Sequence, residues 1–287
     1  MDQLSLAKKI SSIENGSEEI LDILASANPL NTPIIGITGP PGAGKSSLVD
    51  ALTQVWVNAE KKVAILCIDP SSPFHSGALL GDRIRMNKWF NNPNVFIRSL
   101  ATRGALGGLH PKIIEITELV KSFGFDYIII ETVGVGQSEV EIAGLADICI
   151  VAIVPEAGDE IQTMKSGIME IADIFVVNKA DRPGADQFVN NLKLMLAPAF
   201  TSHSMEVPVL KTIATTNEGI ELLETTIQQL LKQTATSDKK INLLVEKAYH
   251  LIRQERMRDI NKIELKEKIK EVGNDFNLYR FIKQFKK

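Results

Sequence analysis

The sequence has few cysteines and histidines, and this scarcity limits the metal and redox chemistry open to it. Its two cysteines, Cys67 and Cys149, lie in separate apolar runs, and it contains neither a C-x-x-C pair nor a Cys/His cluster. A structural zinc site or a dithiol redox site would need such a grouping. We therefore predict that both cysteines are core residues with no metal or redox role.

The chain also lacks a positive charge excess and a long apolar run. Its net charge of −3 gives no global basic field, so neither nucleic acid nor a membrane is an expected partner. No apolar stretch approaches the length of a membrane span, and the N-terminus has no secretory pattern. With 44% apolar and 23% charged residues, the composition is typical of a globular protein, and we expect it in the cytoplasm.

One segment has the pattern of a phosphate-binding loop. Residues 39–46 read G-P-P-G-A-G-K-S, which matches G-x-x-x-x-G-K-[ST] in full, between an apolar run and a helical pattern. Its alternative is an ordinary glycine-rich turn between strand and helix. In a phosphate loop, backbone N–H groups converge on phosphate oxygens. Lys45 would then reach the β- and γ-phosphates and Ser46 a magnesium ion, with further nucleotide contacts from Gly39, Pro41, Gly42, Ala43, Gly44 and Ser47.

A second segment indicates which base is bound. Asn178-Lys179-Ala180-Asp181 follows the apolar run 174–177. The carboxylate of Asp181 can accept two parallel hydrogen bonds, from N1–H and from the exocyclic amine of guanine. Adenine lacks these donors and would leave Asp181 buried and unpaired. N-K-x-D alone is a weak signal, but its position after a phosphate loop predicts guanine recognition by Asn178, Lys179 and Asp181.

Acidic residues end two of the apolar runs. Asp69 follows run 63–68, and Glu131 follows the run that begins at Tyr127. A carboxylate at such a strand end, beside a phosphate loop, is where magnesium is held. A single strand-end acid is more often a solvated loop residue or a helix cap, but two flanking one phosphate site favour a function. Asp82 is a third candidate, and Gly134 would offer its N–H to the γ-phosphate.

Seven short apolar runs alternate with helical patterns along the chain. Continuous apolar runs between helices predict an α/β fold, namely a doubly wound, mostly parallel sheet with the nucleotide at the carboxyl ends of its strands. We expect an N-terminal helical extension over 1–32, a P-loop GTPase domain over 33–236 and a C-terminal helical arm over 237–287. The predicted strands are 34–38, 63–68, 95–100, 127–131, 148–154, 174–178 and 209–213.

The arm is expected to contain two helices, because no glycine turn interrupts it before residues 272–274. It is either a solvated surface helix or an arm for dimerisation or a partner. We favour the second interpretation, because the segment is too polar to form a core of its own.

Six motifs together resemble the MeaB/ArgK family of GTPases, within the class that includes signal-recognition and nickel-insertion GTPases. The resemblance extends in order from about residue 33 to 225. Members of that family are G-protein chaperones of adenosylcobalamin-dependent acyl-CoA mutases, chiefly methylmalonyl-CoA mutase. They gate cofactor loading and protect the mutase from inactivation. The motifs are G-P-P-G-A-G-K-S, D-P-S-S-P, G-D-R-I-R-M, R-G-A-L-G-G-L, E-T-V-G-V-G-Q-S-E and N-K-A-D.

The resemblance also implies residue roles. GTP or GDP and Mg²⁺ would be the cofactors, whereas adenosylcobalamin would belong to the partner mutase. The protein would hydrolyse GTP as a homodimer. Ala214 would lie in the last base-contacting loop. The implied catalytic residues are Lys45, Asp69, Asp82 and Glu131; the implied metal ligands are Ser46, Asp69, Asp82 and Glu131; and the implied switch residues for coupling to the partner are Asp159, Gln162 and Lys165.

Three other functions stay open at this point. A nickel-insertion GTPase usually carries His- or Cys-rich tracts, whereas the four histidines here are scattered. An older label for the family, an arginine and ornithine transport-system kinase, implies a P-loop kinase, which has no need for N-K-x-D. The third is a protein that binds GTP without hydrolysing it. Candidate arginines near the phosphates are Arg83, Arg85 and Arg103.

Overall fold

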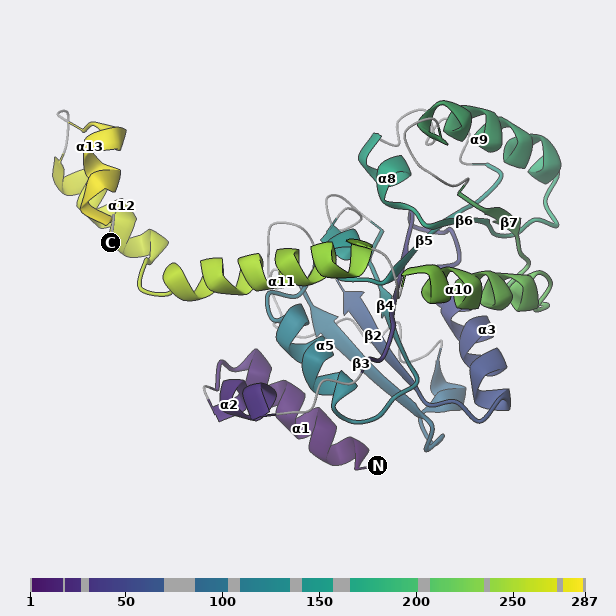
Figure 1. Cartoon of the computed structure of the whole chain (residues 1–287), viewed down its shortest axis with the longest axis horizontal. Helices are drawn as coiled ribbons and strands as arrows, with labels where there is room; N and C mark the ends of the chain where they lie inside the picture. Colours follow the sequence, from purple (N-terminus) through teal and green to yellow (C-terminus); the bar gives the residue numbers. More distant parts are fainter. Residues whose placement is uncertain are drawn as a thin grey trace. The chain divides into compact units, whose positions relative to one another are not determined.

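The residues that the structure describes form one seven-stranded sheet in the order β3-β2-β4-β1-β5-β6-β7, and every strand pair in it is parallel (Figure 1). The computed structural model describes residues 2–17, 19–26, 31–69, 86–102, 109–134, 141–156, 166–200, 207–234, 238–272 and 276–285. The strands are β1 (Ile34–Thr38), β2 (Val63–Asp69), β3 (Val95–Ala101), β4 (Tyr127–Glu131), β5 (Ile148–Ile153), β6 (Ile174–Val177) and β7 (Val209–Lys211).

These strands confirm the seven predicted ones, with small differences at their ends. The largest is at β7, which stops at Lys211, two residues before the predicted end. Beyond it, Ile213 forms an isolated antiparallel bridge with Glu218, so the chain has already turned away from the parallel ladder.

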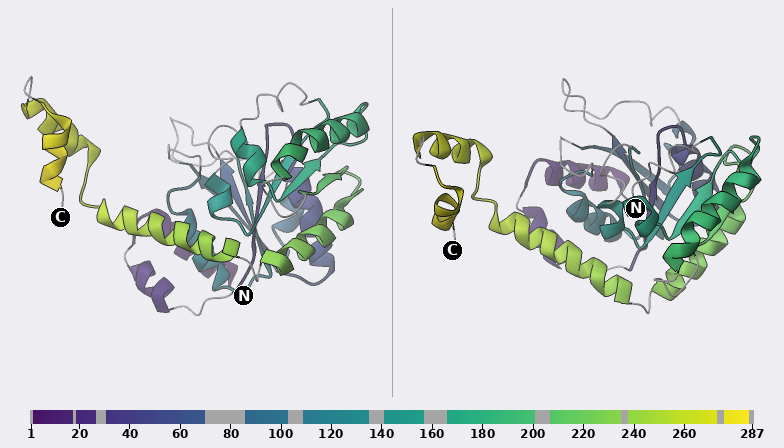
Figure 2. Two further views of the ribbon diagram at one scale, coloured as in Figure 1. Left: turned by 45° about the horizontal axis from the view of Figure 1, so that its top comes forward. Right: turned by 90° about the horizontal axis from the view of Figure 1, so that it is seen from above.

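Helices cover both faces of the sheet (Figure 2), which confirms the doubly wound α/β fold. Buried side chains of β5 alternate between the two sides. Ile148, Ile150 and Ala152 belong to one core, and Val151 and Ile153 belong to another. One face is covered by α3 (Lys45–Asn58) and α10 (Ile220–Thr234), and the other by α1 (Gln3–Glu14), α2 (Glu19–Ser26), α5 (Ile113–Lys121) and α9 (Ala185–Phe200); α8 (Ser166–Ile171), η1 (Asn87–Trp89) and η2 (Ile142–Gly144) lie in connections.

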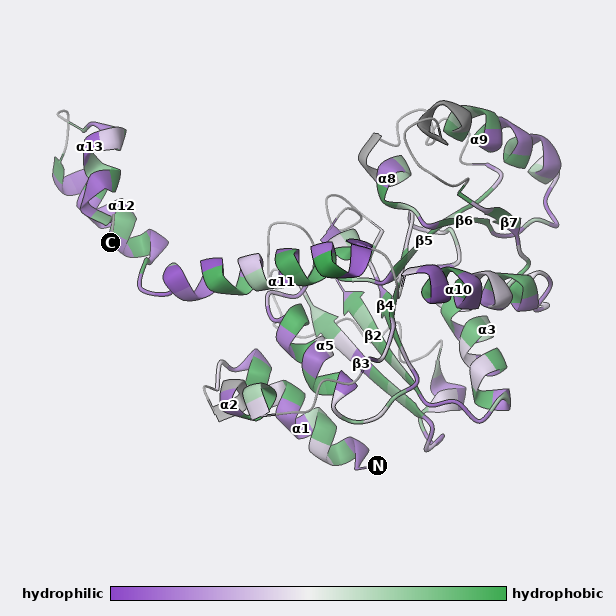
Figure 3. Cartoon of the chain, viewed as in Figure 1, coloured by the Kyte–Doolittle hydropathy of each residue, from purple (hydrophilic) through white to green (hydrophobic). Residues whose placement is uncertain are grey.

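Burial on both faces explains why the strands read as continuous apolar runs. Every residue of β1, β2, β4, β5 and β6 is buried, and the strands are coloured mostly as hydrophobic in Figure 3. Removing one such aliphatic side chain from water contributes about 1.5–3 kcal/mol to folding. Within the described part of the chain, no helix combines the length and the apolar character that crossing a bilayer requires.

The C-terminal region corrects one expectation. Two helices were expected, but the described residues form three α-helices, α11 (Asp238–Arg256), α12 (Lys262–Val272) and α13 (Leu278–Ile282). A 3-10 turn, η4 (Lys283–Phe285), follows them. The chain breaks before α12 because the side chain of Asn261 accepts a hydrogen bond from the N–H of Ile263 at 2.8 Å, which starts a new helix.

The chain forms two compact units, Met1–Leu243 and Leu244–Lys287. The first contains the sheet together with α1 and α2, and the second contains α12 and α13. The domain boundaries expected at residues 32 and 236 stay predictions.

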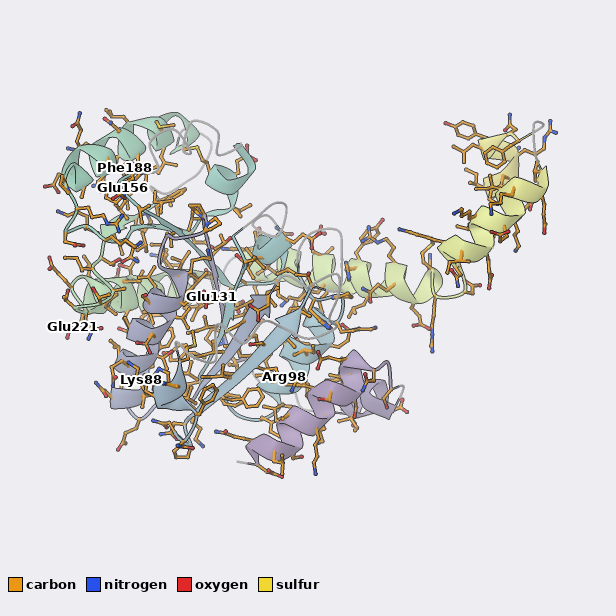
Figure 4. All side chains as sticks on the ribbon, turned by 180° about the vertical axis from the view of Figure 1, so that it is seen from behind. Lys88, Arg98, Glu131, Glu156, Phe188 and Glu221 are labelled. Carbon is orange, nitrogen blue, oxygen red and sulfur yellow. The ribbon has the colours of Figure 1, made fainter. Side chains whose placement is uncertain are left out.

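The first helix is tied to the edge strand β3. The amide of Gln3 donates to the carbonyl oxygens of Pro93 and Val95 at 3.2 and 3.1 Å. Further along α1, Glu14 forms an ion pair with Arg98 of β3. Figure 4 shows Arg98 on the side of the sheet next to α1. These contacts join the N-terminal helix to β3, and Gln3 occupies carbonyl oxygens at and just before the start of this edge strand.

Both cysteines are buried, which confirms their assignment to the core. Burial raises the pKa of the Cys149 thiol to about 12. Because the thiolate is the nucleophile, Cys149 in a Cys67→Ala variant should not be alkylated by iodoacetamide at pH 8 while the chain is folded. Mass spectrometry should show the adduct only after unfolding in guanidinium. Rapid alkylation of the folded chain, at the rate of the unfolded one, would show that the core opens around β5.

Candidate functional site

The phosphate loop connects the central strand β1 to α3. From β1 the chain first builds the β2 side of the sheet and later, through β5, the other side. The loop therefore lies at the switch point where ligands bind in such folds. Gly44, with φ +85°, precedes the first helical residue, Lys45. The Lys45 ammonium donates to the carbonyl oxygens of Gly39 and Pro40 at 2.8 and 3.1 Å. This places a positive charge and a helix N-terminus together, as a phosphate group requires.

A cavity of about 370 Å³ lies beside this loop. It contains the two predicted strand-end acids, which are both buried, at 8% exposure for Asp69 and 6% for Glu131. The hydroxyl of Ser46 donates to Oε1 of Glu131 at 2.6 Å. The cavity is lined by Pro41, Gly42, Gly44, Lys45, Ser46, Ser47, Ile68, Asp69, Glu131, Thr132, Val133 and Lys179.

Strand pairing explains why the two acids meet. In the register of β2 with β4, Cys67 is opposite Glu131, so Asp69 lies two residues further along the neighbouring strand. Figure 4 shows Glu131 at the ends of the central strands.

The N-K-A-D segment follows β6 and borders a second cavity of about 250 Å³. Asn178 is buried, and its side-chain amide forms hydrogen bonds with other residues of the protein. Its Nδ2 donates to the Ala43 carbonyl at 2.9 Å, while its Oδ1 accepts from the Thr212 hydroxyl at 3.1 Å and from the Ala214 N–H at 3.2 Å. Lys179 donates to the Gly42 carbonyl at 2.8 Å. The cavity is lined by Ser47, Asn178, Lys179, Asp181, Arg182, Ile213, Ala214 and Thr215.

The two cavities are neighbours, since Ser47 and Lys179 line both. One cavity offers a phosphate loop with buried acids, and the other offers a carboxylate able to read a base. Their total size suits one nucleotide, because ligand pockets are typically about 300–1,000 Å³.

One expectation about Asp181 needs correction. The sequence suggested a buried carboxylate, but Asp181 is exposed at the rim of the second cavity. The connection after β6 follows the protein surface, where a charged side chain stays hydrated. Any penalty against adenine would therefore arise only once a base covers the carboxylate.

The structure brings together most, but not all, of the predicted residues. Ala43 and Gly39 contribute carbonyl oxygens to Asn178 and Lys45, and Gly134 lies beside both Gly39 and Lys45. The predicted Asp82, the switch residues Asp159, Gln162 and Lys165, and the arginines Arg83, Arg85 and Arg103 lie outside the described residues.

Sequence reasoning missed several residues of the two cavities. Thr132 lines the first cavity, and its hydroxyl donates to that of Thr38 at 2.8 Å. Its position directly after Glu131 was the available signal. Arg182 lines the second cavity and directly follows N-K-A-D, where no motif marks it. Thr212 lies in the last base-contacting loop that the resemblance implied, residues 212–220; it lines neither cavity and contacts Asn178 because β6 and β7 pair.

Gly134 provides a test of how tightly the phosphate site is packed. Its φ is +83°, and an added Cβ would lie 2.2 Å from the Gly39 oxygen and 2.4 Å from the Lys45 Nζ. Gly42 has a similar φ of +82° but open space around it, so Gly42→Ala is a matched control. We expect Gly134→Ala to cost about 1–3 kcal/mol more stability than Gly42→Ala, measured by urea unfolding without nucleotide. Equal costs would mean that only backbone strain matters at both positions.

Comparisons with known proteins agree with this geometry. A relative from Pyrococcus abyssi, provisionally named a GTPase, is 47% identical over 227 residues, covering 77% of this chain and 70% of its own. "GTPase ArgK" of Escherichia coli is 43% identical over 53% of this chain and 46% of its own. "Methylmalonic aciduria type A homolog, mitochondrial" of Caenorhabditis elegans is 46% identical over 51% of this chain and 37% of its own.

Among solved structures, a "LAO/AO transport system kinase" matches 99% of this chain and 92% of its own, with a TM-score of 0.65 and 22% identity. HypB from Helicobacter pylori in complex with nickel matches 81% of this chain and 98% of its own, with a TM-score of 0.54 and 18% identity. At these identities both structures show a shared fold alone. The family described as "Methylmalonyl Co-A mutase-associated GTPase MeaB" matches residues 5–268. This chain therefore belongs to the MeaB family of P-loop GTPases, and it is a GTPase that binds guanine nucleotides.

Proposed function

We propose that this GTPase binds one GTP across both cavities and serves an adenosylcobalamin-dependent acyl-CoA mutase, of which methylmalonyl-CoA mutase is the first candidate. The observation that carries the nucleotide assignment is that the phosphate-loop cavity and the N-K-A-D cavity are neighbours, with Ser47 and Lys179 lining both. The guanine base would occupy the cavity at Asp181, and the triphosphate would extend along the phosphate loop toward Glu131.

The donor set beside the loop fits a magnesium ion. Ser46, Asp69 and Glu131 provide a hydroxyl and two carboxylates in one cavity, and oxygen ligands are what Mg²⁺ prefers. Mg²⁺ usually takes only one or two carboxylates and completes its shell with water and phosphate oxygens. When bound there, the ion would neutralise charge on the phosphates. Asp82 stays a predicted member of this set.

The proposed roles of the other residues follow from their positions. Lys45 would leave the Gly39 and Pro40 carbonyl oxygens for the β- and γ-phosphates, where its charge stabilises the transferring phosphoryl group. Asp69 and Glu131 would orient the attacking water. Gly134 would donate its N–H to the γ-phosphate. Asn178 would keep the phosphate loop and the loop at Ala214 at a fixed separation, so that base and phosphates bind as one unit.

Two observations support the mutase partner. The family is named for its association with methylmalonyl-CoA mutase, and the Caenorhabditis elegans relative is named for methylmalonic aciduria. The nickel alternative gains no support, because in the described parts of the chain no group of three or more His, Cys, Asp or Glu side chains is placed to hold a metal ion.

We also propose a homodimer. Apolar side chains on α11 are exposed, and a second copy would bury them; they are Ile241, Leu244, Val245, Tyr249 and Ile252. The oligomeric state can be measured by light scattering after size exclusion. A monomer at micromolar concentration would contradict this part of the proposal.

The partner proposal can be tested by co-purification. The tagged chain should retain methylmalonyl-CoA mutase in a nucleotide-dependent manner, compared between GDP and a non-hydrolysable GTP analogue. Its slow GTP hydrolysis should accelerate at least tenfold with the mutase, because a partner can order the switch segments. The control is a coenzyme-B12-independent acyl-CoA enzyme. Equal hydrolysis with the mutase and with the control would refute the partnership while leaving the GTPase assignment intact.

A further inference from the structure

Arg182 and Glu156 connect two loops that leave neighbouring strands. Glu156 follows β5, and Arg182 follows the N-K-A-D segment after β6; the two strands pair with Ile153 opposite Val177. The Arg182 Nη1 donates to Oε1 of Glu156 at 2.6 Å. Figure 4 shows Glu156 on the side of the protein where Phe188 of α9 lies. The pair thus joins the two chain segments that follow β5 and β6 at the carboxyl edge of the sheet.

Arg182 is also a wall of the second cavity, next to Asp181. A long arginine side chain has many rotamers, and fixing it requires a partner. Glu156 supplies that partner. The hydrogen bond from Arg182 lowers the pKa of Glu156, and the charge of Lys179, another wall of the cavity, acts in the same direction. The carboxylate therefore stays charged at neutral pH and holds the guanidinium at the cavity.

We propose that Arg182 is a nucleotide-positioning residue, held by Glu156 against the base cavity so that the pair slows the release of the guanine base. This inference rests on the proposed placement of the base in that cavity. Asp181 would read the edge of the base, whereas a planar guanidinium beside it can stack on the face of a purine. The two residues would therefore act on different surfaces of one ligand.

The expected effect is moderate because the pair is exposed, with 42% and 53% of the two side chains accessible. Exposed ion pairs change equilibria by only a few-fold. We therefore expect Arg182→Ala and Glu156→Gln each to accelerate nucleotide dissociation about two- to fivefold. The double variant should be no faster than Arg182→Ala, because both changes remove the same interaction.

The experiment uses the full chain loaded with N-methylanthraniloyl-GDP, chased with excess GDP in a stopped-flow fluorimeter. Asp186→Asn is the matched control, since it breaks a second exposed pair, Lys211 with Asp186 at 2.6 Å, away from the cavity. Its dissociation rate should equal that of the wild type. The charge-exchanged variant Arg182→Glu with Glu156→Arg keeps an ion pair but removes the guanidinium from the wall of the cavity. It should release the nucleotide as fast as Arg182→Ala, whereas a merely structural role of the pair would predict recovery of the lost retention.

Two results would overturn the inference: dissociation at the wild-type rate in both single variants, or acceleration by Arg182→Ala with no change in Glu156→Gln. Melting temperatures without nucleotide separate retention from folding, and we expect Glu156→Gln to match Asp186→Asn in this measurement. If the wild type fails to retain the labelled GDP at all, the proposed site fails together with the inference. Normal wild-type retention with unchanged variants removes only the inference.

Discussion

Asp181→Asn is expected to weaken GTP binding about 10²–10³-fold and to transfer the preference to xanthosine triphosphate. The carboxylate would accept two charge-assisted hydrogen bonds from guanine, each worth about 1.5–3 kcal/mol. Asparagine keeps one acceptor but replaces the other with an N–H donor, which faces the exocyclic amine of guanine as a second donor. Xanthine has a carbonyl oxygen at that position, so the new donor finds an acceptor. Calorimetric titration with the two nucleotides measures the exchange.

Two controls belong to this experiment. Asp186→Asn removes an exposed acid that does not line the cavity, so it should leave GTP affinity unchanged. ATP should bind weakly to the wild type and to Asp181→Asn. If Asp181→Asn binds GTP as tightly as the wild type, the base does not lie against Asp181, and the placement of the nucleotide is wrong.

Glu131→Gln should reduce the rate of GTP hydrolysis about 10²–10³-fold at saturating GTP, a loss typical of removing one preorganised charge from an active site. Glutamine has nearly the same shape and can still accept from the Ser46 hydroxyl, so the phosphate loop should keep its geometry. Only the buried negative charge is lost. The measurements are phosphate release at saturating nucleotide and GDP affinity, and the second should change much less than the first.

Glu115→Gln is the matched control for this change. Glu115 lies on α5, has the same 6% exposure as Glu131 and forms an ion pair with Lys112 at 2.8 Å, but it lines neither cavity. It should lose some stability while hydrolysing GTP at the wild-type rate. Similar losses of hydrolysis in both variants would indicate a general effect of a buried charge on folding, and Glu131 would then have no special role.

Much of the fold follows from local patterns. A strand buried on both faces needs an unbroken apolar run, so the seven strands were visible in the sequence. The break between α11 and α12 was not, because it depends on one side chain, Asn261, that competes with the helix for a backbone N–H. Asparagine is common enough in polar helices that its presence alone marks no boundary.

The residues of the site likewise fall into those that the sequence predicts and those that it does not. The phosphate loop and the strand-end acids were predictable, because a contiguous motif or a strand end fixes where each side chain lies. The bonds of Asn178 were not, since its partners Ala43, Thr212 and Ala214 are 135, 34 and 36 residues away. The contact of Asn178 with a base stays a prediction, and the structure adds that its amide joins the phosphate loop and the loop at Ala214 to the end of β6. The ion pair of Arg182 with Glu156 was hidden for the same reason.

The contact of Gln3 with Pro93 and Val95 has a consequence for any shortened version of this protein. Strand β3 has seven residues, and among the strands of the described residues β2 alone pairs with it, so its outer side can recruit another polypeptide. Shortening the chain from its N-terminus would remove Gln3, whose side chain occupies carbonyl oxygens at and just before the start of β3. Such a truncated GTPase should aggregate through strand addition, even with every nucleotide-binding residue intact.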